Sequence, residues 1–107
     1  MGVLVSAARL MYITSYRHDL EYKIQLINTA RANLLSSMNT MMANGADMDP
    51  ESPEVKIMEQ RKQRLMLIDK KLDQELQQYQ TQLNVINAEE QGVTKSLQQG
   101  IEHSYQH

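Results

Sequence analysis

The sequence of 107 residues has no cysteine, tryptophan or phenylalanine, and it has only four glycines and two prolines. Without cysteine there can be no disulfide scaffold, thiolate metal site, iron–sulfur cluster or thiol nucleophile. Tyrosine supplies all of the aromatic residues, which make up 5% of the chain, and eight methionines replace part of the bulk that usually fills a compact core. A chain of this length forms one small domain at most, which excludes a multidomain enzyme.

A long apolar run is also missing. The small and apolar residues at the start of the chain end at Arg9, well short of the roughly 18 residues that span a bilayer. No positively charged segment precedes them, as one would in a signal peptide. We therefore expect neither a cleaved leader nor a transmembrane segment. The net charge of −2 gives no general attraction to nucleic acid, so we expect no nucleic-acid partner.

Helical periodicity dominates residues 3–43. Neither proline nor glycine interrupts this range, and apolar side chains recur at intervals of seven, which predicts a helix with a heptad seam. Further apolar residues widen the seam, whereas charged residues are expected to fall largely outside it. The seam comprises Ile13, Leu20, Ile27, Leu34 and Met41, flanked by Leu10, Tyr16, Ile24, Ala30 and Met38, and the polar residues placed outside it are Arg17, Glu21, Lys23, Asn28 and Arg31.

Residues 44–52 form a punctuated segment that predicts a loop. Gly45 is expected to take the left-handed conformation that closes a helix. Ser52 then suits the N-cap of a second helix, with Pro53 at the first helical position, where its missing N–H is harmless. A start one turn earlier, next to Pro50, is the alternative. The residues expected to shape the turn are Gly45, Pro50 and Pro53.

The second helix is predicted over about residues 53–105. Its apolar stripe has steps that average about 3.6 residues, which is closer to the period of a straight helix than to that of a left-handed supercoil. The stripe comprises Met58, Leu65, Ile68, Leu72, Leu76, Tyr79, Leu83, Ile86, Val93, Leu97 and Ile101.

These patterns predict an all-α fold, a long antiparallel helical hairpin of residues 1–107 with coiled-coil-like packing. At about 1.5 Å per residue the helices would be on the order of 60 and 75 Å long, which predicts a rod. Because two helices cannot cover all of each other's apolar surface, we expect copies of the chain to assemble. The expected assembly seam comprises Ile13, Leu20, Ile27, Leu34, Met41, Leu65, Ile68, Leu72, Leu76, Leu83 and Ile86.

Few residues are suited to catalysis or metal binding. His103 and His107 are four apart and could share a helical face, but a solvated tail is the preferred interpretation. No combination of nucleophile, base and orienting acid can be assembled, and no glycine-rich phosphate loop occurs. We therefore expect a protein that is not an enzyme and has no cofactor or metal.

Two further clusters stand out. The second helix has a basic cluster without the interleaved aromatics that stack on nucleic-acid bases, so a solvated face that pairs with acidic residues of the same helix or of a neighbouring subunit is preferred over nucleic-acid or acidic-lipid binding. Methionines gather near the loop, where they either fill the core or form a surface that packs against partners. The clusters are Arg61, Lys62, Arg64, Lys70 and Lys71, and Met38, Met41, Met42 and Met48.

The loop motif Pro50-Glu51-Ser52-Pro53 and the polar helix after it, through residues 91–97, resemble the helical-hairpin subunits of bacterial type III secretion needles and inner rods. The resemblance covers about residues 47–107, although this chain is longer and its first helix is more apolar. It implies export without a cleaved signal, contacts with secretion apparatus proteins, and helical stacking with the second helix facing a lumen. The candidate lumen face comprises Lys95, Gln98, Gln99 and Glu102.

The expected function is therefore that of a structural protein, the self-assembling protomer of a helical filament or tube. Such a protein would be extracellular or at the cell surface. The alternative is a cytoplasmic coiled-coil adaptor or chaperone that forms a small oligomer.

Overall fold

The computed structural model describes residues 2–105. Helix α1 comprises Val3–Gly45 and helix α2 comprises Pro53–Tyr105, and the described residues contain no strand. The predicted all-α fold, an antiparallel helical hairpin with a Pro-x-x-Pro loop, is confirmed. The sequence predicted helical ranges of 3–43 and 53–105, so α1 continues two residues further than expected. That residues 1–107 act as one domain stays a prediction.

The start of α2 is fixed by hydrogen bonds in the loop. The backbone N–H of Ser52 donates to the carbonyl of Asp49 over 2.9 Å, and the N–H of Glu51 donates to the Asp49 carboxylate over 3.0 Å. These bonds close a turn around Pro50. The Ser52 hydroxyl then accepts a bond of 3.3 Å from the N–H of Val55, which is the predicted N-cap. The alternative start one turn earlier is therefore wrong.

Gly45 differs from expectation. It is the last residue of α1, and no glycine among residues 2–105 has a positive φ, so the predicted left-handed cap is wrong. The last carbonyls of α1 are instead satisfied by tight turns, in which the N–H of Ala46 donates to Ala43 and that of Met48 donates to Gly45. The glycine is explained by a close approach, because a Cβ there would lie 3.2 Å from the sulfur of Met58.

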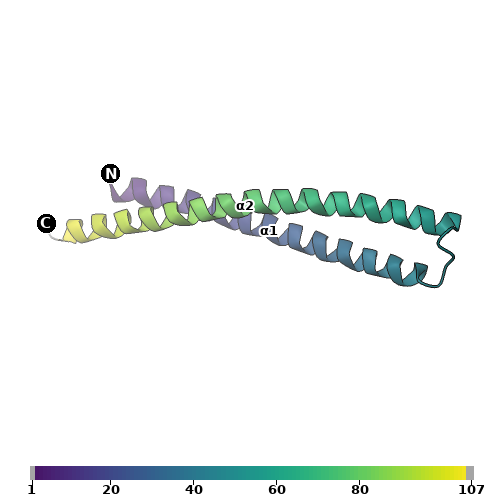
Figure 1. Cartoon of the computed structure of the whole chain (residues 1–107). Helices are drawn as coiled ribbons and strands as arrows, with labels where there is room; N and C mark the ends of the chain where they lie inside the picture. The colour runs from purple at the N-terminus through teal and green to yellow at the C-terminus, as the bar shows by residue number, and fades with distance from the viewer. Residues whose placement is uncertain (1, 106–107) are drawn as a thin grey trace. The chain divides into compact units, whose positions relative to one another are not determined.

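The contacts of the chain divide it into two compact units, and each contains a stretch of both helices. The terminal unit comprises the residues up to Ile24 and those from Gln78 onward. Within it the first turns of α1 lie beside the last turns of α2 (Figure 1). The loop unit comprises Gln25–Gln77, and within it the loop joins the two helices.

The terminal unit holds the main apolar cluster. Its buried members come from both helices, and partly buried side chains pack against them. The cluster comprises Ile13, Leu20, Ile86 and Val93, with Leu10, Tyr79 and Leu83 around them. In the loop unit, the buried apolar side chains are Ile27 and Leu76. Burial of these aliphatic side chains is the main source of stability, at about 1.5–3 kcal/mol for each fully buried one.

Both helices bury positions at alternating intervals of three and four residues, which is the heptad pattern of a coiled coil. In α1 the series begins at positions 3, 6, 10 and 13 and continues to 45, and in α2 it begins at 55, 58, 62 and 65 and continues to 100. We call these two series the inter-helix seam. The predicted period of about 3.6 residues in the second helix is therefore wrong.

The seam also contains residues that the sequence placed outside it. Arg17 and Arg31 occupy seam positions of α1, so the expectation that they fall outside is wrong. In α2 the seam passes through Asp69 and Gly100, whereas the neighbouring Ile68 and Ile101 are exposed. The other nine residues of the predicted stripe lie in the seam, and the stripe departs from it only at these two positions, where the seam residue is a charged aspartate or a glycine without a side chain.

Candidate functional site

The predicted assembly residues lie mostly in the inter-helix seam of a single chain. Ten of the eleven are buried or half-buried, and Ile68 is the exception with 48% of its surface exposed. Ile13, Leu20, Leu83 and Ile86 belong to one cluster in the terminal unit. Contacts within the hairpin thus already occupy this part of the apolar surface, and a role for it between copies stays a prediction. The surfaces left for a partner lie on the outer sides of the helices.

A charged layer crosses the seam of the terminal unit. The guanidinium of Arg17 on α1 donates from Nε to Oε2 of Glu90 on α2 over 2.8 Å, and from its Nη1 to Glu21 over 2.8 Å. The hydroxyl of Thr14 donates a longer bond, 3.4 Å, to the same Glu90 oxygen. Hydrogen bonding to the two glutamates raises the pKa of Arg17. These contacts let charged side chains occupy seam positions without an unpaired charge.

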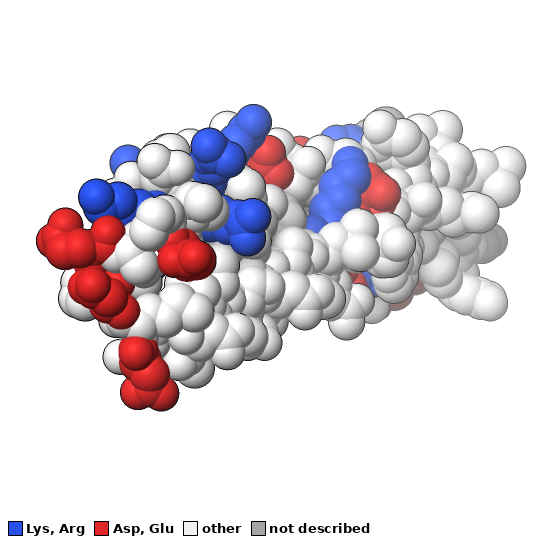
Figure 2. Space-filling view, turned by 90° about the vertical axis from the view of Figure 1, so that its right-hand side faces the viewer, with Lys and Arg blue, Asp and Glu red and all other residues white. Residues whose placement is uncertain are grey.

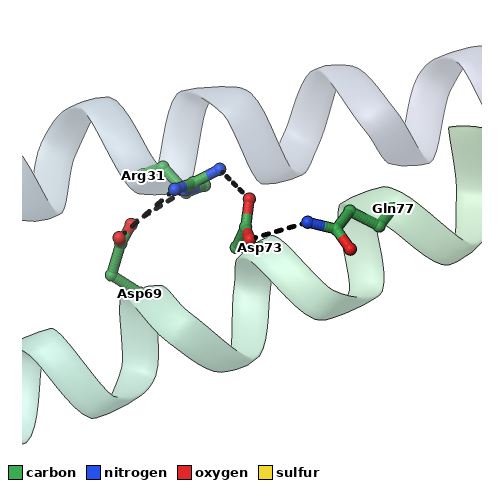
Figure 3. A network of polar contacts seen from close by, with 4 residues as sticks. All are labelled: Arg31, Asp69, Asp73 and Gln77. Atoms are coloured by element: carbon green, nitrogen blue, oxygen red, sulfur yellow. Dashed lines mark hydrogen bonds and ion pairs between the residues drawn. The ribbon is translucent and has the colours of Figure 1, made fainter.

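A second charged layer lies in the loop unit (Figure 3). Arg31 of α1 donates two hydrogen bonds to the Asp69 carboxylate of α2, over 2.8 Å from Nε and 3.3 Å from Nη2. Its Nη1 donates a third hydrogen bond to Asp73 over 2.9 Å. Gln77 in turn donates to Asp73 over 3.0 Å. The hydrogen bonds from Arg31 lower the pKa of the Asp69 carboxyl. The fork of the guanidinium suits this arrangement, which a lysine could not reproduce.

The lowered pKa of Asp69 predicts an acid-dependent loss of stability. A carboxyl whose pKa is lower in the folded than in the unfolded chain stabilises the fold above the unfolded value, about 4, and this contribution disappears as the pH falls through the folded value. We expect Asp69→Asn to be less stable than the wild type near pH 6, and the difference to shrink below about pH 4. Urea unfolding followed by circular dichroism measures it.

Asp47→Asn is the control for this experiment, because Asp47 is exposed in the loop and no ion pair is found for it in residues 2–105. It should differ little from the wild type throughout. A deficit of Asp69→Asn that stayed constant down to pH 3 would contradict the assignment.

Large apolar side chains are exposed on the outer sides of both units. In the terminal unit, four lie on α1 as two adjacent pairs that are two turns apart, and they form what we call the N-terminal patch, of which Leu4 is the most exposed at 86%. In the loop unit, three consecutive residues of α2 are exposed, with Leu67 at 69%. Clusters of this kind mark contact sites more often than scattered apolar residues do. The patch comprises Leu4, Val5, Met11 and Tyr12, and the consecutive residues are Met66, Leu67 and Ile68.

Charge is separated within the loop unit. The loop end, residues 47–59, carries five carboxylates and one lysine, for a formal charge of −4, whereas residues 61–71 carry five cations and one aspartate, for a formal charge of +4. Figure 2 shows acidic side chains gathered at the loop end with basic side chains next to them. The predicted pairing of the basic cluster with acidic residues of the same helix is not found among residues 2–105.

Three methionines near the loop, Met41, Met42 and Met58, line a shallow hollow. It has a volume of about 210 Å³ and lies between the end of α1 and the start of α2. Its wall is apolar apart from Glu59. Both sequence interpretations therefore hold in part, because Met38 and Met41 are half-buried in the inter-helix seam, whereas Met42 and Met48 are exposed. The hollow is lined by Met41, Met42, Gly45, Ala46, Val55, Met58 and Glu59.

The remaining predicted residues are placed as follows. The candidate lumen face is exposed at all four positions, Lys95, Gln98, Gln99 and Glu102. His107 lies outside the described residues, and no group of acidic and histidine side chains able to hold a metal ion occurs within residues 2–105. Over the same range, neither helix has a stretch long and apolar enough to cross a bilayer.

The two charged layers could have been predicted by assigning the charged residues, as well as the apolar ones, to positions of the seven-residue repeat. Arg17 and Arg31 share a heptad position, and so do Asp69 and Glu90, which indicates complementary charges facing one another in a seam.

The chain was also compared with known proteins. Neither a family model, nor a curated protein, nor a solved structure matches it, so the resemblance to needle and inner-rod subunits stays an expectation.

Proposed function

We propose that this chain is a structural protein whose copies assemble into a helical filament or tube of the kind that secretion needles exemplify. In this proposal the chain has no catalytic role, and it works at the cell surface or outside the cell. The observation that carries the proposal is the set of large apolar side chains exposed on the outer sides of the hairpin. The seam residues are not available for this role, because the two helices of the same chain already bury them against each other.

The N-terminal patch supports the proposal most strongly. Leu4 and Met11 are seven residues apart, as are Val5 and Tyr12, so the four side chains lie on one side of α1. All four are more than half exposed. Covering one such side chain is worth about 1.5–3 kcal/mol, so a contact between copies would remove a substantial penalty for hydrating this surface.

Concentration-dependent assembly tests the proposal. We expect the mass measured by light scattering and sedimentation to rise with protein concentration, and negative-stain electron microscopy to show filaments. Replacing Met11 by aspartate should raise the concentration needed for assembly about tenfold or more, because 1.4 kcal/mol corresponds to a factor of ten. Gln25→Asp is the matched control, since Gln25 is also exposed on α1.

Two results would argue against a filament. A stable monomer or dimer at high concentration would contradict the proposal outright. A small oligomer of fixed size that leaves the N-terminal patch uncovered would instead favour the coiled-coil adaptor or chaperone.

A further inference from the structure

We propose that the exposed basic side of α2 in the loop unit binds the acidic loop end of a second copy of the same chain. This inference rests on the proposed function, because it names the surfaces through which copies meet. Three observations within residues 2–105 carry it. An exposed apolar centre lies between cations that have no ion pair, a hollow lies next to the carboxylates of Asp47 and Glu59, which have none either, and the chain geometry prevents the two surfaces from meeting within one copy.

The first surface, which we call the basic face, has an apolar centre. Leu67 and Ile68 are exposed, and Arg64 and Lys71 lie three or four residues before and after them, on the same side of the helix. Lys70 is exposed beside them. Within residues 2–105 none of these three cations has an ion pair. The acidic neighbour Asp69 is held by Arg31 and does not neutralise them.

The second surface is the loop end with its hollow. Asp47 follows Ala46, which lines the hollow, and Glu59 lines it directly. The wall between them is formed by methionine, valine and alanine side chains, and the flexible methionines adapt readily to an incoming apolar group. An apolar hollow beside carboxylates is therefore the counterpart of an apolar side chain between cations. The opposite formal charges of −4 and +4 fit this pairing.

The two surfaces cannot pair within one chain. Helix α2 is continuous, and Glu59, the residue of the hollow nearest to Leu67, lies eight residues or about 12 Å before it along the helix, so Leu67 cannot enter the hollow of its own copy. The loop side chains of the same copy do not reach that far. A second copy removes this constraint, and because the two surfaces differ, every copy in a row still offers one of each. Contacts of this type continue until they close a ring or extend a helical filament.

An anionic membrane is a weaker partner for the basic face. Anionic lipid headgroups would attract the cations and could accept Leu67. They would, however, repel the five carboxylates of residues 47–59, of which Glu59 lies within two helical turns of Arg64. The loop end of a second copy meets no such penalty.

Charge reversal on each surface tests the docking. One variant carries Arg64→Glu and Lys71→Glu, and the other carries Asp47→Lys and Glu59→Lys. All four positions are exposed, so circular dichroism should show unchanged helix content. Each variant alone should need at least about tenfold more protein to assemble. An equimolar mixture should assemble again, because each variant then meets a surface of opposite charge. Glu89→Lys, a reversal at an exposed position of the terminal unit, should have little effect.

A neutral pair of variants tests the apolar centre. Leu67→Ser should weaken assembly about as much as one charge reversal, whereas Val85→Ser, which also removes an exposed aliphatic side chain from α2, should not. Equal effects of the two would overturn the assignment of Leu67 to the contact.

The outcomes separate this docking from the proposed function. If the wild type assembles and the reversals do not weaken it, the docking is wrong and the proposed function stands. If the wild type forms no filament, sedimentation of the mixed variants still measures the contact. A mixed complex then supports the docking without a filament, and its absence overturns both. Binding of the wild type to phosphatidylserine vesicles that Lys71→Glu abolishes, with assembly unchanged, would overturn the docking in favour of a lipid surface.

Discussion

Replacing Leu20 by alanine should lower the free energy of unfolding of the hairpin by about 2–5 kcal/mol. Leu20 is the most buried large side chain of the described residues, with 1% of its surface exposed, and it lies in the cluster of Ile13, Ile86 and Val93. Truncation removes its transfer free energy and leaves a cavity that the continuous helices cannot easily close. Because the whole chain is stabilised by a narrow seam, this loss is a large fraction of the total.

The measurement is denaturant unfolding followed by circular dichroism, at a concentration below that at which copies assemble. Leu67→Ala is the matched control, since Leu67 is 69% exposed and its truncation should change stability by no more than about 0.5 kcal/mol. Equal losses for the two variants would show that Leu20 is not in the core. Leu20→Asp should be worse than alanine, because it buries a carboxylate among aliphatic side chains.

Reversing the charge of Glu90 should destabilise the terminal unit, and reversing Arg17 as well should restore most of the loss. In Glu90→Arg, two guanidinium groups would share a seam position where the wild type has a bond of 2.8 Å, and both would lack a carboxylate across the seam. In the double variant Arg17→Glu with Glu90→Arg the pair re-forms in the opposite sense. We expect the single reversal to have a smaller effect than Leu20→Ala but a clear one.

A double-mutant cycle measures the coupling between the two residues. The comparison is Asp19→Lys, which reverses one partner of the more exposed pair with Lys23 along α1 and should change stability little. If the double variant were no more stable than the two single reversals predict together, Arg17 and Glu90 would not be partners across the seam.

Much of the fold follows from the sequence because the strongest signals are local. The seven-residue spacing from Ile13 to Met41 is unbroken, and the loop is marked by Pro50 and Pro53 together with the N-cap at Ser52. Capping and helix propensity depend on neighbouring residues, so they can be recognised without knowing the tertiary contacts.

The seam of α2 could not be predicted from apolar residues alone. Hydropathy predicts Ile68 rather than its neighbour Asp69 as the seam residue, yet the aspartate lies in the seam, where Arg31 pairs with it. Asp69 can occupy the seam position because a charge is tolerated there when a partner of opposite charge comes from the other helix. That partner lies 38 residues away in the chain, beyond any local pattern.

The predicted cap at the end of α1 is wrong for a related reason. Gly45 was expected to act through its backbone, as a left-handed cap, whereas the structure shows a close approach of Met58 from the other helix. A glycine after a helical stretch predicts the cap because that is its usual role. Only the packing of the two helices reveals that the missing side chain leaves room for a neighbour.

The charged layers have a consequence for how the two helices find their alignment. A heptad seam allows one helix to slide along the other by seven residues, since apolar positions would still meet. Such a slip would carry Arg31 from Asp69 to Leu76 or to Lys62, and Arg17 from Glu90 to Leu83 or Leu97. Each slipped register would leave a guanidinium without its carboxylate in an apolar or basic setting. The arginines therefore select one register among those that the repeat permits, and a chain that unfolds should return to the same pairing.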